Sequence, residues 1–212
     1  MSEYAFDHDS GSLALDFSNT SEWHASEKPS EHLHNFADLV DWGEEFLLLP
    51  AHEARRLRQS ASEQPEQAAQ SYAHAIQLRE ALFAIFSSRY RGRPIPEPAL
   101  TLLNEMVRRA MAHLQLVPVG GELNWKWAPE VEGVNLILWP VARAAAELLT
   151  SEKSGRVREC DDDRGCGWLF IDQSKNRSRR WCSMESCGNR AKARRHYARR
   201  ESPEGIRAHS SS

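Results

Sequence analysis

Four cysteines near the end of this 212-residue chain constrain its fold more than any other feature. They are Cys160, Cys166, Cys182 and Cys187, and no cysteine precedes them. Two close pairs separated by fifteen residues have the spacing of a four-cysteine zinc site, because each pair lies on a turn that directs both sulfurs to one point. Four thiolates leave no ligand position for water, so we expect one zinc ion with a structural role.

The sequence between the cysteine pairs supports this prediction. Residues 167–172 alternate like a strand, and the rings of Trp168, Phe170 and Trp181 can form a small core. A module of this size buries too little apolar surface to fold alone, and a bound metal supplies the missing stability. Two disulfides, unrelated buried thiols and a redox switch that releases zinc on oxidation remain alternatives.

The N-terminal segment MSEYAFDHDSGSLALDF is acidic, whereas a secretory signal is basic at its start. No apolar run approaches the ~20 residues of a membrane span. We therefore expect a cytoplasmic protein with no membrane partner.

Charge is distributed unevenly along the chain. Residues 156–200 contain 13 Lys and Arg against 6 Asp and Glu, whereas the other residues contain 14 against 24. The cysteine-rich segment stays basic when the negative charge of a zinc tetrathiolate is included. An acidic body with a basic C-terminal module points to an anionic partner for that module, and a solvated charged surface is the alternative.

Residues 1–153 are expected to form a mostly helical α+β domain. The apolar patterns predict a strand at 13–17, helices at 32–49, 51–60, 65–90, 98–114 and 134–150, and a hairpin of 116–119 with 123–127 around Gly120-Gly121. These three strands could form a small antiparallel sheet. Pro140 is expected to kink the last helix or mark its start. A polar boundary at 151–155 separates this domain from a finger at 156–200, and 201–212 are expected to be a disordered tail.

Asp16, Asn19 and Thr20 are candidate ligand-binding residues at the end of the first predicted strand. Their polar groups suit a small ligand, but capping of the following turn is the favoured interpretation. No Gly-rich phosphate loop, HExxH or GxSxG motif is present, so we expect no enzymatic activity.

The run 181–184 (WCSM) followed by 187–192 (CGNRAK) closely resembles the CGNR zinc finger, a treble-clef-type finger. Residues 15–20, 39–42 and 78–82 resemble the α/β domain called ABATE, which precedes this finger in stress-induced bacterial transcription regulators. Ser18 departs from the aliphatic residue that the family more often has there. The resemblance implies zinc at the four cysteines, DNA binding by the finger and ligand sensing by the body.

The segment that begins with the CGNR letters is rich in Ala and Arg and predicts a helix. At 100° per residue, Lys192, Arg195 and Arg199 lie within about 60° of one another on the side away from the zinc. We expect this stripe to contact phosphates or bases. Arg190 and Arg194 flank the zinc side, where they can contact DNA or instead bond to the thiolates or to carboxylates of the body.

A second basic run precedes Cys182 and is expected to be a loop that clamps a phosphate backbone together with the helix. Its cations are Lys175, Arg177, Arg179 and Arg180. The leading hypothesis is a transcription regulator with a DNA-binding finger and a sensing or homodimerising body. The alternatives are a zinc module for protein–protein contact, RNA binding, and a finger helix that docks on the acidic body.

Overall fold

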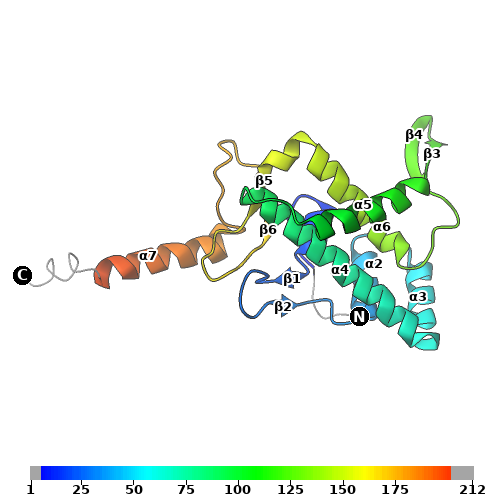
Figure 1. Cartoon of the computed structure of the whole chain (residues 1–212), viewed down its shortest axis with the longest axis horizontal. Helices are drawn as coiled ribbons and strands as arrows, with labels where there is room; N and C mark the ends of the chain where they lie inside the picture. The colour runs from blue at the N-terminus through cyan, green and yellow to red at the C-terminus, as the bar shows by residue number, and fades with distance from the viewer. Residues whose placement is uncertain (1–5, 202–212) are drawn as a thin grey trace, which may run out of the picture.

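The computed structural model describes residues 6–201, with the side chains of residues 195, 196 and 198–201 left out. The body contains α1 (Leu13–Ser18), β1 (Ser21–Glu22), β2 (Ser30–Glu31), α2 (Phe36–Glu45), α3 (Ala51–Glu63), α4 (Pro65–Tyr90), α5 (Glu97–Ala112), β3 (Leu114–Val119), β4 (Glu122–Trp127) and α6 (Asn135–Thr150). The finger follows with η1 (Glu152–Arg156), β5 (Val157–Glu159), β6 (Leu169–Ile171), η2 (Met184–Gly188) and α7 (Asn189–Glu201). The fold is therefore α+β and mostly helical, as predicted (Figure 1).

The long helix α4 lies at the centre of the body and contacts α1, α2, α3, α5 and α6. Pro65 occupies its first turn, where the missing N–H costs nothing. Its buried face includes Leu78, Leu82 and Ile85, which pack with Phe17 and with residues of α2 and α6 in one core. None of the helices that residues 6–201 form has both the length and the apolar composition needed to cross a membrane.

The prediction of a strand at 13–17 is wrong, because these residues form helix α1. Every residue from Ala14 to Ser18 is buried. Burial on all sides removes the contrast on which periodicity depends, so a short apolar run does not distinguish a strand from a helix. The Ser18 hydroxyl donates to the Ala14 carbonyl oxygen at 2.8 Å, a helical i−4 contact.

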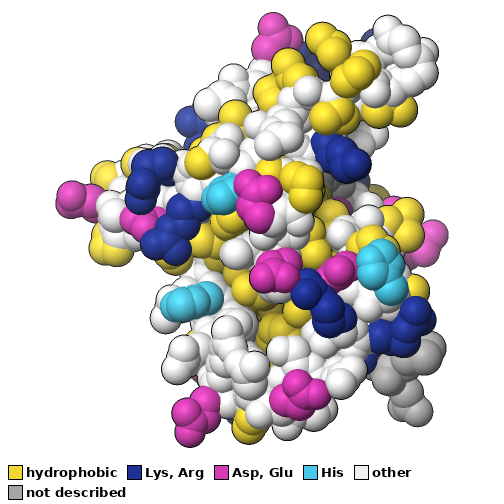
Figure 2. All heavy atoms as spheres, turned by 90° about the vertical axis from the view of Figure 1, so that its right-hand side faces the viewer, with side chains coloured by type: hydrophobic (Ala, Val, Ile, Leu, Met, Phe, Trp, Pro, Cys, Tyr) yellow, Lys and Arg dark blue, Asp and Glu magenta, His cyan; other side chains and the backbone are white. Residues whose placement is uncertain are grey.

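The predicted antiparallel pairing is present, but not as a three-stranded sheet. The described strands form three separate antiparallel pairs, β1–β2, β3–β4 and β5–β6. The predicted hairpin is present as β3–β4 and turns at Gly120 and Gly121, which both have positive φ. One face of this hairpin carries Leu116, Leu123 and Trp125, each at least half exposed. Figure 2 shows apolar side chains gathered at the top of the molecule, where the hairpin projects.

Other boundaries differ by a few residues from the sequence predictions. Helix α2 begins at Phe36 because the side chain of Asn35 accepts hydrogen bonds from the N–H groups of Ala37 and Asp38. Helix α6 begins at Asn135 and continues through Pro140. Helix α7 ends at Glu201, and the rest of the predicted tail, 202–212, lies outside the described residues.

The body and the finger share a hydrophobic core. Val157 of β5, together with Leu169 and Ile171 of β6, belongs to the same buried cluster as the helices of the body. The expected polar boundary at 151–155 is the short turn η1, in which Ser154 is buried. The finger hairpin therefore packs on the body as part of its core.

Candidate metal centre and its basic surface

Each cysteine of the finger lies at the end of a short structured element. Cys160 directly follows β5, and Cys166 lies in the turn that leads to β6. Cys182 follows the basic loop, and Cys187 lies in η2, the single turn that continues into α7. A hairpin followed by a helix is the arrangement expected of a treble-clef finger, with one cysteine pair on each.

The four sulfur atoms converge on one point. All four Sγ atoms lie within 4.8 Å of one another, with Cys166 and Cys182 at 3.8 Å and Cys182 and Cys187 at 3.6 Å. A tetrahedral zinc with Zn–S distances of ~2.3 Å places its sulfurs ~3.8 Å apart. The four cysteines are free thiols rather than two disulfides. The donor set and its geometry therefore fit one structural zinc ion.

Neighbouring groups donate hydrogen bonds to the sulfurs. The backbone N–H of Cys182 donates to Cys160 Sγ at 3.4 Å, and the Arg190 guanidinium donates to Cys187 Sγ at 3.0 Å. Hydrogen bonding from the Cys166 thiol lowers the pKa of Cys160. Such donors favour the thiolate, which is the form that binds zinc.

A loop of the body covers the metal centre. Trp23, between β1 and β2, packs with the cysteines and with Trp168 and Trp181. A Cβ atom on Gly165 would lie 2.5 Å from the carbonyl oxygen of Ala25, so only glycine allows this approach. The finger turn around Cys166 is therefore fitted to the body loop.

The same loop is tied to α4. His24 hydrogen-bonds to Glu80 at 2.8 Å and stacks on Phe83 with ring centroids 3.6 Å apart. Nearby, Arg79, which is almost fully buried, donates two 2.6 Å hydrogen bonds to Glu31. Burial disfavours the charged form of Glu31, but these hydrogen bonds outweigh it and lower its pKa. The loop over the zinc site thus has a fixed anchor on the central helix.

Asp162 organises the arginines that flank the metal. Its side chain is fully buried and accepts hydrogen bonds from Arg164 and Arg194 at 3.2 Å, and Arg190 lies 3.6 Å from it. Although burial disfavours its charged form, the hydrogen bonds from Arg164 lower the pKa of Asp162 well below its usual range. Arg194 also pairs with Asp163. These carboxylates belong to the finger itself, so Arg190 and Arg194 are held within it.

The two arginines that precede Trp181, Arg179 and Arg180, also have partners within the finger. Arg179 donates to the carbonyl oxygens of Trp181 and Cys182 and lies over the ring of Phe170. Arg180 forms a 2.9 Å ion pair with Asp161. These contacts shape the loop before the second cysteine pair.

The remaining predicted cations are more open. Lys175, Arg177 and Lys192 are exposed, and no hydrogen bond or ion pair joins their side chains to another part of residues 6–201. The side chains of Arg195 and Arg199 lie outside the described residues. Figure 1 shows α7 extending away from the helical body, so this structure does not place the helix on the acidic body.

Two family profiles together cover most of the chain. The ABATE profile, described as "Putative stress-induced transcription regulator", matches residues 11–152. The chain belongs to the ABATE family. The CGNR zinc finger profile matches residues 156–200, which contain the four cysteines, and both descriptions are regulatory or zinc-binding rather than enzymatic. No curated protein matches the chain in sequence.

The candidate ligand residues of the ABATE body have partners within the fold. Asn19 donates to the carbonyl oxygen of Leu169 and accepts from its N–H, both at 2.9 Å. The Thr20 hydroxyl donates to the Phe17 carbonyl oxygen at 2.8 Å. Asp16 is buried in α1, where burial raises the pKa of its carboxyl to about 6. The Asn19 and Thr20 contacts tie α1 to its surroundings, and Asn19 joins the body to β6.

Sequence reasoning missed Trp23, Asp162 and Glu159. Glu159 is buried between body and finger, where it accepts from Ser87 at 2.7 Å and from Arg91 at the end of α4. Asp162 could have been found from the sequence. It lies in an acidic run, 161–163, between two cysteines, and the charge of this run is opposite to that of the basic helix α7 in the same finger. Nothing local in the sequence marks Trp23, whose role depends on packing across the fold.

Proposed function

We propose that this ABATE protein is a transcription regulator that binds DNA through its CGNR finger. The observation that supports this best is the division of the finger's cations into two sets. One set, which includes Arg164, Arg190 and Arg194, is paired with the carboxylates of 161–163. The other set, Lys175, Arg177 and Lys192, is exposed and available for phosphates. Phosphate contacts by such cations supply most of the affinity for DNA.

The shape of the finger favours duplex DNA. Helix α7 has 13 residues, about 20 Å at 1.5 Å per residue, and extends away from the body. The major groove of B-DNA admits an α-helix, whereas the major groove of duplex RNA is too deep and narrow. Single-stranded RNA and an acidic protein surface remain the alternative partners, and both would use the same cations.

Alanine variants measured across a salt series test the proposal. Lys192→Ala and Lys175→Ala are each expected to weaken duplex binding and to reduce the salt slope by about 1, because each removes one phosphate contact. Arg195→Ala and Arg199→Ala should have the same effect as the lysine variants if these arginines contact phosphates. If one of them contacts a base, its loss should weaken binding by ~1–3 kcal/mol, mainly on the preferred sequence. Fluorescence anisotropy with labelled duplexes measures both quantities.

The matched control is Lys126→Ala on the β3–β4 hairpin, which should bind DNA like the unmodified protein. Arg194→Ala should affect zinc retention or folding more than affinity, since its partners lie in the finger. If all the α7 and loop variants bind duplex DNA like the unmodified protein, this surface is not the DNA-binding one.

A further inference from the structure

A cavity of about 600 Å³ lies between α3, the first turns of α4 and the start of α6. Its volume falls within the ~300–1,000 Å³ typical of small-molecule sites. Its apolar part includes Phe36 and Leu57, and residues 133–135 close one side. It lies in the body, and its lining includes neither a cysteine of the zinc site nor the predicted ligand residues Asp16, Asn19 and Thr20.

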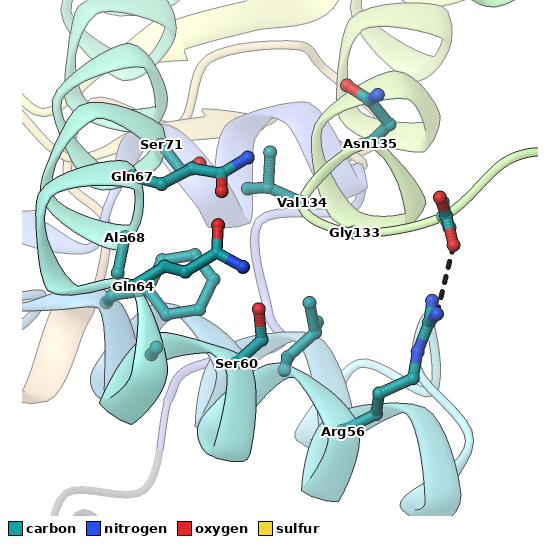
Figure 3. Close-up of a pocket in the computed structure, with 13 residues that line it drawn as sticks. Arg56, Ser60, Gln64, Gln67, Ala68, Ser71, Gly133, Val134 and Asn135 are labelled. Atoms are coloured by element: carbon teal, nitrogen blue, oxygen red, sulfur yellow. Dashed lines mark hydrogen bonds and ion pairs between the residues drawn. The ribbon is translucent and has the colours of Figure 1, made fainter.

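The polar groups of this cavity are amides and hydroxyls. They are the side chains of Ser60, Gln64, Gln67, Ser71 and Asn135. Figure 3 shows Gln67 extending from α4, Ser60 from α3, and Gln64 from the link between these helices, toward the same space. None of these five side chains hydrogen-bonds to another residue anywhere in the described part of the chain. Each amide offers both donors and an acceptor, so the cavity presents a set of free groups of both kinds.

The two charged residues that line the cavity are paired with each other, and the cation, Arg56, is also held at 2.9 Å by Glu53 of the same helix. Arg56 Nη1 lies 2.9 Å from Glu132 Oε2, an ion pair that closes one side of the opening (Figure 3). No other cation or anion is among the lining residues. A charged ligand would have to break this pair or remain uncompensated, whereas a neutral ligand leaves it intact.

We propose that this cavity binds an uncharged, hydroxyl-rich molecule of sugar size. Amide side chains recognise hydroxyl groups because they both donate to and accept from them. The partly buried ring of Phe36 and the side chain of Leu57 offer an apolar surface for the C–H face of such a ring. The inference does not depend on DNA binding by the finger, and it is measured without DNA.

The test uses the full-length, zinc-loaded chain. Glucose, ribose, trehalose and myo-inositol are titrated at millimolar concentrations and followed by NMR of the glutamine and asparagine side-chain amides. Glucose 6-phosphate and benzoate serve as charged comparators. We expect saturable binding of at least one neutral probe and weaker binding of both comparators. If no neutral probe binds saturably, or if a comparator binds more tightly, the proposal is overturned.

Variants locate the binding. Gln67→Ala and Asn135→Ala are each expected to weaken the neutral probe about 3- to 10-fold, as expected for the loss of one or two hydrogen bonds. Ser60→Trp, which fills the cavity, should abolish binding. Gln70→Ala removes the same kind of side chain from an exposed position of the same helix that does not line the cavity, and it should leave the affinity unchanged. If Gln67→Ala and Gln70→Ala bind the neutral probe with equal affinity, and both keep their helical circular dichroism, the assignment of the binding site to this cavity is overturned.

Discussion

The Cys182→Ser variant is expected to lose its zinc and to destabilise the whole chain. Zinc binding to finger peptides is worth roughly 10–16 kcal/mol at neutral pH, and a serine hydroxyl does not replace a thiolate ligand. Since Val157, Leu169 and Ile171 belong to the main core, a disordered finger exposes part of that core. We expect the free energy of unfolding of the whole chain to fall by ~3–4 kcal/mol. For a chain of this length, this change lowers the Tm by about 10 °C.

Metal analysis of freshly purified, reduced protein and thermal unfolding by circular dichroism measure the two effects. Chelation of the unmodified protein should lower its Tm in the same way, and added zinc should restore the unmodified protein but not the variant. One zinc per chain is expected before chelation. A variant that lacks zinc but retains the full Tm would show that the body is independent of the finger.

Asn19→Ala is the second change with a large expected effect. The substitution removes both partners of the buried Leu169 backbone, leaving its N–H and its carbonyl oxygen without hydrogen bonds. An unsatisfied buried group costs about 1–3 kcal/mol, so the loss of two should lower the free energy of unfolding by about 2–6 kcal/mol. Urea denaturation followed by tryptophan fluorescence measures this change.

The control for Asn19→Ala is Asn176→Ala, in the exposed loop before the second cysteine pair. Its free energy of unfolding should change by less than about 0.5 kcal/mol. If Asn19→Ala is as stable as this control, the two hydrogen bonds do not contribute to the joint between body and finger.

Local signals in the sequence were sufficient for several elements. The spacing of Cys160, Cys166, Cys182 and Cys187 predicted the zinc site, because coordination depends on residue type and on turns within each pair. Proline at position 65 and glycine at position 92 bounded the helix that the structure shows as α4. The paired glycines at 120 and 121 predicted the β3–β4 turn, because a tight hairpin turn requires the positive φ that glycine adopts readily.

Features that depend on distant parts of the chain were not predictable in this way. Helix α1 is buried on all sides, so its apolar pattern carries no information about the period. The strands form three separate pairs, and which strands pair depends on how the helices bring them together rather than on the sequence of each strand. The placement of Trp23 over the zinc cysteines depends on the anchoring of its loop to α4 and on space at Gly165. Likewise, the polar cavity forms only where residues 132–135, at the start of α6, lie against the distant helices α3 and α4.

DNA binding by the finger is tested most directly by retention of nucleic acid on the full-length, zinc-loaded chain. Random-sequence pools of duplex DNA, single-stranded DNA and RNA of equal length are offered in parallel. We expect duplex DNA to be retained best, with strong salt dependence, enrichment of one sequence over successive rounds, and loss of retention after zinc is chelated. Retention of RNA alone, or of none of the pools, would contradict the proposal that this ABATE protein regulates transcription through its finger.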